Sequence, residues 1–274
     1  MTASKGATLT DIAEYLAFAH RLADLSAAQI LPHFRNLDSV ANKAEGADFD
    51  PVTIADREAE KAIRAAIGQA YPGHGIVGEE FGETGGGDAY RWVIDPIDGT
   101  RAFIMGSPLW GTLIGLLESG RPVLGLMNQP FTGERFWGAA KGAHYRGPGG
   151  ERKLATRACP ALDRATLATT SPDLLGEGFE RERFQAVSEG VLERRFGGDC
   201  YSYCLLAAGH LDLVIETGLK PHDIVALIPI IEQAGGRVTQ WDGSDAAAGG
   251  RIVACGDPKL HDTVLEMLGP GQDG

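Results

Sequence analysis

The stretch Trp92-Val93-Ile94-Asp95-Pro96-Ile97-Asp98-Gly99-Thr100 says most about the fold and the function of this chain. Three apolar residues begin it, which is typical of a short buried strand that would deliver Asp95 at its end. Pro96 cannot donate to a strand ladder, so the chain is expected to turn there. Asp98 follows close enough for both carboxylates to meet one cation. Carboxylate and carbonyl oxygens are ligands that Mg²⁺ prefers, so the stretch predicts a site for a hard cation.

Gly99 and Thr100 would open a helical turn whose backbone N–H groups can bind phosphate. The alternative is a plain turn in which Asp98 caps a helix, but it leaves Asp95 unpaired at a strand end. Haloacid-dehalogenase phosphatases use D-x-D-x-T with the first Asp as nucleophile. The spacing here is D-x-x-D-G-T, which redirects the second carboxylate and disfavours an aspartyl-phosphate mechanism. The dipeptide His222-Asp223 lacks the all-helical frame of HD-type enzymes.

Hydrophobic periodicity around this stretch predicts two lobes of an α/β protein. The first has helices at 10–31 and 55–70, a polar connection at 38–49, a strand at 75–77, and an antiparallel meander over residues 90–139. After the turn Gly147-Pro148-Gly149-Gly150, strands near 166–170, 195–196 and 211–216 alternate with helices near 178–191, 200–209 and 222–234. The predicted division is 1–147 and 148–274, with both lobes forming one continuous catalytic unit.

Composition narrows the classes of partner. The 274 residues carry 25 Lys+Arg and 37 Asp+Glu, and the net charge of −12 argues against nucleic acid or an anionic membrane as the main partner. The longest apolar run, Ile224–Ile231, contains Pro229 and is far below the ~20 residues needed to span a bilayer. The N-terminus shows no apolar signal segment. Four cysteines without metal-binding spacing predict buried, reduced thiols in a cytoplasmic protein.

Further acids are candidates for the same site. Glu79 and Glu80 follow the short strand at 75–77, and the alternative for them is a solvated loop. Asp56 could instead belong to a capping box with Thr53 as the N-cap. Asp223 lies in the first turn of a helix, where an acid also suits the helix dipole.

Three segments together resemble the inositol-monophosphatase-like family of metal-dependent phosphatases over about residues 10–265: Gly78-Glu79-Glu80, Trp92 to Thr100, and Lys220-Pro221-His222-Asp223 before an apolar helix. Within the family, the chain most resembles histidinol-phosphate phosphatase. That likeness is carried by Asp50-Pro51-Val52-Thr53-Ile54-Ala55-Asp56, Asp98-Gly99-Thr100-Arg101-Ala102-Phe103-Ile104 and Gly198-Asp199-Cys200-Tyr201. The resemblance implies a five-layered αβαβα sandwich, usually a homodimer.

The resemblance also implies a role for each matching position, with two to three Mg²⁺ ions per site. The first ion would be held by Glu79, Asp95 and the carbonyl of Ile97. The second would be held by Asp95, Asp98 and Asp223, and a third would share Glu79. The attacking water would be oriented by Asp56 and Thr100, with Glu80 supporting the metal shell. Phosphate would bind to the backbone N–H groups of Gly99 and Thr100.

The predicted reaction is hydrolysis of histidinol phosphate to histidinol and phosphate, as in histidine biosynthesis, by direct attack of water. This phosphomonoester carries an ammonium group and an imidazole, so its pocket should hold additional carboxylates. The candidates are Asp199, for which a helix N-cap is the alternative, and Glu216, for which a solvated strand end is the alternative. Rival substrates are inositol-1-phosphate, fructose-1,6-bisphosphate and 3′-phosphoadenosine nucleotides. Rivals of another class are a regulatory partner of RNA or the transcription machinery, and a metal-independent glycosidase.

Overall fold

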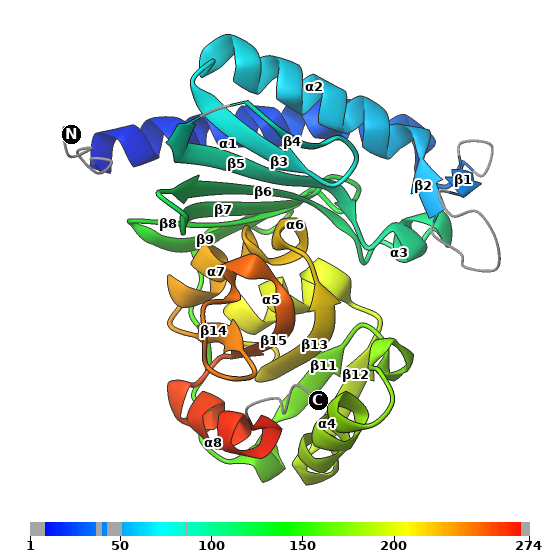
Figure 1. Cartoon of the computed structure of the whole chain (residues 1–274), viewed down its shortest axis with the longest axis vertical. Coiled ribbons are helices and arrows are strands. Elements are labelled where there is room, and N and C mark those ends of the chain that lie inside the picture. The colour runs from blue at the N-terminus through cyan, green and yellow to red at the C-terminus, as the bar shows by residue number, and fades with distance from the viewer. Residues whose placement is uncertain (1–8, 37–39, 43–50, 86, 270–274) are drawn as a thin grey trace.

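A computed structural model of the chain describes residues 9–36, 40–42, 51–85 and 87–269. Its helices and sheets form five layers, as predicted (Figure 1). The outer face of the first sheet is covered by α1 (Leu9–Ile30) and α2 (Ile54–Ala70). The layer between the sheets holds α5 (Asp199–Ala207), α6 (Pro221–Ile224) and α7 (Leu227–Glu232). The far face of the second sheet is covered by α4 (Phe179–Gly190) and α8 (Pro258–Leu268).

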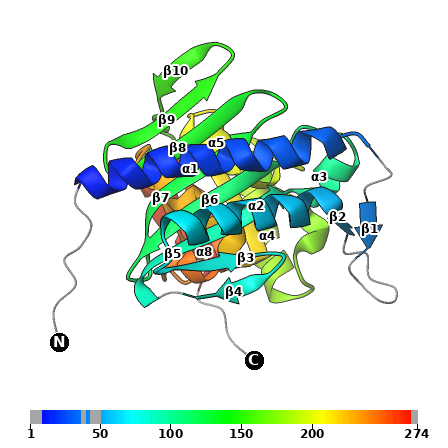
Figure 2. The same cartoon turned by 90° about the horizontal axis from the view of Figure 1, so that it is seen from above.

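The first sheet has eight strands in the order β10-β9-β8-β7-β6-β5-β3-β4. Their bounds are β3 (His74–Gly78), β4 (Gly82–Thr84), β5 (Gly87–Asp98), β6 (Gly111–Glu118), β7 (Arg121–Gln129), β8 (Glu134–Ala139), β9 (Gly142–Gly147) and β10 (Gly150–Lys153). All neighbours are antiparallel except β3 and β5. The meander predicted from the sequence is therefore present, and β9 and β10 extend it. Seen from above, α1 and α2 cross this sheet side by side (Figure 2).

The second sheet has five strands in the order β12-β11-β13-β15-β14. Their bounds are β11 (Thr166–Thr169), β12 (Glu193–Phe196), β13 (Leu213–Leu219), β14 (Arg237–Gln240) and β15 (Gly250–Cys255). The three strands β12, β11 and β13 are parallel, whereas β15 runs antiparallel to both β13 and β14. A separate pair of strands is formed by β1 (Val40–Asn42) and β2 (Pro51–Thr53). The rest of the predicted connection at 38–49 lies outside the described residues.

Two helix predictions differ from the structure. The single helix expected at 222–234 is divided into α6 and α7, because Pro229 lacks the N–H that would bond to the carbonyl of Val225. Helix α8 was not predicted, although the sequence carries signals for it. Asp257 caps it by accepting from the N–H of Lys259 at 2.9 Å, and Pro258 begins it. Its buried residues Leu260, Val264 and Leu268 recur at four-residue steps.

All four cysteines are buried free thiols, as predicted. Within the described part of the chain, none of the helices has both the length and the apolar character required to cross a bilayer.

A row of three glycines joins the two lobes. Gly115, Gly125 and Gly138 face one another across β6, β7 and β8. A Cβ added to Gly125 would lie 1.8 Å from the carbonyl oxygen of Ala226, and one added to Gly138 would lie 2.1 Å from that of Pro229. The backbone of α7 and of the short link between α6 and α7 therefore rests directly on the sheet.

Gly138→Ala tests this contact. The new methyl group would collide with backbone rather than with a flexible side chain, so we expect the ~1–3 kcal/mol cost of overpacking, or a Tm lower by roughly 2–12 °C. Gly68→Ala is the matched control, because Gly68 is an exposed residue of α2 with nothing within 4 Å of an added Cβ. It should be neutral or stabilising by up to ~1 kcal/mol. Equal thermal stability of Gly138→Ala and the wild type would contradict the packing argument.

Candidate active site

Two parallel strands bring the first pair of acids together. In the register of β3 and β5, Gly78 lies opposite Ile94. Glu79 directly follows the first of these residues and Asp95 the second, so the two acids meet at one edge of the sheet, where parallel strands end. Both were sequence-predicted ligands.

A bulge in β5 turns Asp95 and Asp98 toward the same side. Asp95 pairs with Leu113 and Asp98 with Gly111, so β5 spans three residues where β6 spans two. Side chains of a regular strand alternate, and residues three apart would point to opposite faces. The extra residue in β5 brings both side chains to the same face of the strand, and the two carboxylates interact electrostatically. The predicted turn at Pro96 is thus wrong in form, because the strand continues through the bulge to Asp98.

The carboxylates of this cluster disfavour one another's ionisation. Burial raises the pKa of Asp95 well above its usual range, and repulsion from Glu79, Asp98 and Asp223 raises it further. Burial likewise raises the pKa of Asp98, with added repulsion from Asp199 and Asp223. Acids this close cannot all be ionised without a neutralising cation. The set of oxygen ligands therefore fits a hard divalent ion.

The C-terminal lobe contributes Asp223 from the first turn of α6. Its Oδ2 accepts a hydrogen bond from the backbone N–H of Lys220 at 2.7 Å, and its Oδ1 lies 3.6 Å from Nε2 of His222. Asp95, His222 and Asp223 each offer a ligand atom within 4.8 Å of the others. His222 was not predicted as a site residue: Lys220-Pro221-His222-Asp223 contributes to the family resemblance, but only Asp223 was assigned a role.

The residues proposed to orient water and phosphate surround the same cluster. Asp56 is only 1% exposed in α2 and adds to the repulsion on Asp95; the side chain of Thr53, its alternative capping partner, lies outside the described residues. Thr100 begins α3 (Thr100–Ile104), and its Oγ1 donates to the carbonyl oxygen of Ile97 at 3.1 Å. Gly99 has a φ of +85°, which favours glycine.

Glu80 lies just behind this group. Its side chain is 2% exposed, and its Oε2 lies 3.8 Å from a guanidinium nitrogen of Arg57. The solvated loop considered as the alternative for Glu80 is therefore wrong.

A pocket of about 170 Å³ opens beside the acids. Its lining includes Thr170, which follows β11, Asp199 from the start of α5, and Glu216 from within β13. Glu216 is buried and accepts hydrogen bonds from the N–H of Thr170 at 2.9 Å and from the hydroxyl of Tyr203 at 3.0 Å. The solvated strand end considered for Glu216 is therefore wrong. Thr170 was overlooked as a site residue, although it is the last residue of a predicted strand.

Asp199 is held in an unusual conformation at the mouth of the pocket. It is the first residue of α5, and Gly198 occupies the N-cap position, so the alternative role of Asp199 as the N-cap is wrong. Its φ of +41° is in the left-handed region, which costs a non-glycine residue on the order of 1–3 kcal/mol. Burial raises the pKa of Asp199 to about 6, with repulsion from Glu216 adding to this effect. A hydrogen bond with Thr170 and the charge of Arg101 oppose the rise.

Asp95→Asn should make the metal-free protein more stable at pH 8. Because the folded-state pKa of Asp95 is raised above its ordinary value of 3.8, its contribution to stability is full below that value and is lost as the pH rises through the folded pKa. Removing the charge should therefore raise the Tm in chelator at pH 8, by a margin that shrinks toward pH 4. Added Mg²⁺ should stabilise the wild type more than the variant.

Asp212→Asn is the matched control for this measurement. Asp212 is also buried, but hydrogen bonds from Arg157 and from the N–H of Thr166 outweigh burial and hold its pKa below the usual range. Its loss should lower the Tm at pH 8. If Asp95→Asn lowers the Tm as much as Asp212→Asn does, repulsion among the clustered acids does not destabilise the folded protein.

Comparisons with known proteins agree with this geometry. A model of the "Inositol monophosphatase family" matches residues 11–269. The chain is 43% identical to the chloroplastic bifunctional phosphatase IMPL2 of Arabidopsis thaliana, over 94% of this chain and 76% of that protein. It is 38% identical to the histidinol-phosphatase of Mycobacterium tuberculosis, over 82% and 86%. The structure of an inositol monophosphatase from Zymomonas mobilis is similar with a TM-score of 0.81 at 43% identity, over 93% and 97%. The chain therefore belongs to the inositol monophosphatase family and is a metal-dependent phosphatase.

Proposed function

We propose that the chain hydrolyses histidinol phosphate in histidine biosynthesis, as a cytoplasmic homodimer that uses two to three Mg²⁺ ions. Relatives named as histidinol-phosphatases and relatives named as inositol monophosphatases are similarly close to this chain, so the substrate has to be argued from the pocket. The observation that carries the proposal is Asp199, an acid outside the proposed metal set that lines the pocket. A substrate ammonium beside it would favour its charged form. Inositol phosphate offers only neutral hydroxyl groups.

Glu216 supports this proposal in a different way. Both of its carboxylate oxygens are already engaged by Thr170 and Tyr203. Its role would be to shape the pocket and to add negative potential for a cationic substrate, whereas Asp199 would contact the ammonium. Both acids line one pocket with Asp98 and Asp223, so the cationic end of a bound substrate would lie next to its reacting phosphate.

The metal ligands we propose are Glu79, Asp95 and the Ile97 carbonyl for one ion and Asp95, Asp98 and Asp223 for the other, with Glu79 shared by a third. Bound cations of this kind polarise the phosphoryl oxygens, lower the pKa of water and stabilise the leaving alkoxide. Asp56 and Thr100 would hold the attacking water in line, with Asp56 accepting its proton. The backbone N–H groups of Gly99 and Thr100 would bind the phosphate. Glu80 would support the metal shell from behind.

Asp199→Asn tests the substrate assignment. Loss of one charge-assisted hydrogen bond should lower kcat/KM for histidinol phosphate by about 1.5–3 kcal/mol, or roughly 10- to 150-fold. Hydrolysis of p-nitrophenyl phosphate, which has no ammonium, should change little and serves as the control. Equal losses on both substrates would assign Asp199 to the fold or the metal shell. A wild-type preference for inositol phosphate would overturn the substrate assignment.

Removal of metal tests the reaction class. Activity should disappear in EDTA and return with Mg²⁺, because the clustered acids repel a phosphate dianion unless bound cations neutralise them. Ca²⁺ should restore little, since its longer and looser coordination suits a tight octahedral site poorly. Full activity in EDTA would refute the metal-dependent mechanism.

A further inference from the structure

The turn that carries Glu79 and Glu80 lies at the edge of the first sheet. It connects β3 to β4, and β4 is the last strand of that sheet. All three residues of β4 are exposed. An edge strand of this length makes few contacts of its own, so something else must hold the turn in place. Because Glu79 is a proposed metal ligand, the geometry of the metal site depends on that support.

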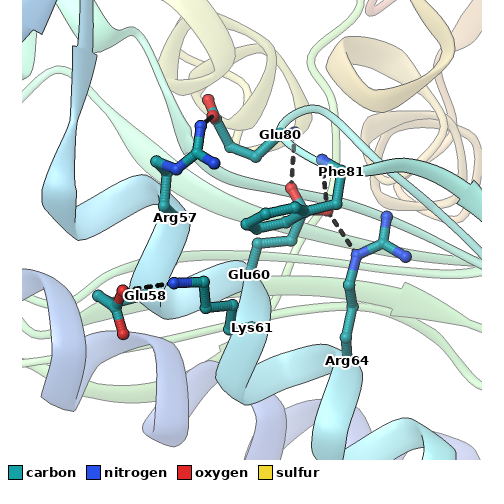
Figure 3. A network of polar contacts seen from close by, with 7 residues as sticks. All are labelled: Arg57, Glu58, Glu60, Lys61, Arg64, Glu80 and Phe81. Carbon is teal, nitrogen blue, oxygen red and sulfur yellow. Dashed lines mark hydrogen bonds and ion pairs between the residues drawn. The ribbon is translucent and has the colours of Figure 1, made fainter.

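The support comes from one buried carboxylate on α2. Glu60 is fully buried, and its Oε2 accepts a hydrogen bond from the N–H of Glu80 at 2.7 Å. Its Oε1 accepts from the N–H of Phe81 at 3.2 Å and from Nε of Arg64 at 2.6 Å. Figure 3 shows Glu60 reaching from the helix to these two backbone groups, with Arg64 beside it.

Arg64 and Phe81 make further contacts with this turn. We refer to Glu60, Arg64 and Phe81 together as the clamp. Arg64 also donates to Oγ1 of Thr84 at 2.8 Å and to the carbonyl of Gly82, so it holds the start of β4. The ring of Phe81 lies 5.1 Å from the guanidinium carbon of Arg57 and 6.0 Å from that of Arg64 (Figure 3). The aromatic ring thus lies against two arginines of α2 and adds a contact between the helix and the turn.

Gly78 leaves the space that the carboxylate needs. A Cβ added at Gly78 would lie 2.1 Å from Oε1 of Glu60 and 2.5 Å from its Cδ. No side chain at position 78 is compatible with a carboxylate in this place. The absence of a side chain at Gly78 thus lets the Glu60 carboxylate of α2 approach the turn closely.

The same helix face connects the clamp to the proposed catalytic group. Asp56, Glu60 and Arg64 follow one another at four-residue steps on α2, and residues four apart share one face of a helix. At one end of this face, Asp56 repels Asp95 electrostatically. In the middle of the face, Glu60 accepts the hydrogen bond from the N–H of Glu80. We infer that Glu60 is a positioning residue that sets the distance between Glu79 and the acids of β5, and so tunes the affinity for Mg²⁺. The inference rests on the metal ligands of the proposed function.

Glu60→Gln is the decisive variant. An amide has the shape of a carboxylate but only one accepting oxygen, so its NH₂ group must face either the N–H of Glu80 or the pair formed by Phe81 and Arg64. The dissociation constant for Mg²⁺, measured by isothermal titration calorimetry without substrate, should rise roughly tenfold. Hydrogen exchange of the Glu80 and Phe81 amides should accelerate in the same variant.

Asp212→Asn provides the control for a role in stability alone. Asp212 is also fully buried and also binds one arginine and one backbone N–H, but it lies in the other lobe. It should lower the Tm while leaving the Mg²⁺ affinity unchanged. If Glu60→Gln binds Mg²⁺ as tightly as the wild type, the positioning role is refuted while the proposed function stands. If the wild type itself binds no Mg²⁺, the proposed function fails first.

Arg64→Gln keeps the test falsifiable if Glu60→Gln does not fold. Arg64 is partly exposed, and its loss leaves Glu60 and both backbone hydrogen bonds in place. Its Mg²⁺ affinity should fall in the same direction by a smaller factor, because the carboxylate and β4 lose one anchor. An unchanged affinity in this variant would equally count against the clamp.

Discussion

Electrostatic repulsion among close carboxylates must be offset by packing in the rest of the structure. Asp95 is buried and faces Glu79, Asp98 and Asp223, and burial and repulsion both disfavour its charged form. Without a cation, the folded chain holds these groups together at a cost in free energy. The backbone that carries them must therefore be anchored by packing elsewhere, or the cluster would spread apart. In the proposed function, the cation that relieves the repulsion is also the one used in catalysis.

The anchors are backbone features rather than side-chain contacts within the cluster. Parallel pairing of β3 with β5 brings two acids to one sheet edge, and the bulge in β5 turns a third to the same side. The glycine row lets α7 and the short link between α6 and α7 rest on the sheet, so the acid from the second lobe arrives at the same place. Each of these features fixes the main chain near a carboxylate by backbone pairing or close packing.

Other buried acids of this chain are arranged in the opposite way. Glu60 and Asp212 each bind an arginine and at least one backbone N–H, which compensates their burial. Asp95 accepts one backbone hydrogen bond, from Ile97, and otherwise meets like charges. A buried acid that binds an arginine and backbone N–H groups stabilises the fold, whereas a buried acid among other acids is a candidate ligand for a cation. This contrast makes the acid cluster the candidate active site on physical grounds, and the family relationship is consistent with it.

The sequence by itself determined the elements with strong local signals and the acids of the D-x-x-D-G-T stretch. The periodicity of α1 and α2 and the short turns of the meander act over a few residues, so they can be recognised without the fold. Only the tertiary structure decided which groups meet. The roles of Glu60, Thr170 and His222 depend on partners from distant segments, and the bulge in β5 exists only in its pairing with β6. Local sequence specifies the conformation of each segment, whereas hydrogen bonding and repulsion between remote side chains are defined only once the segments are packed together.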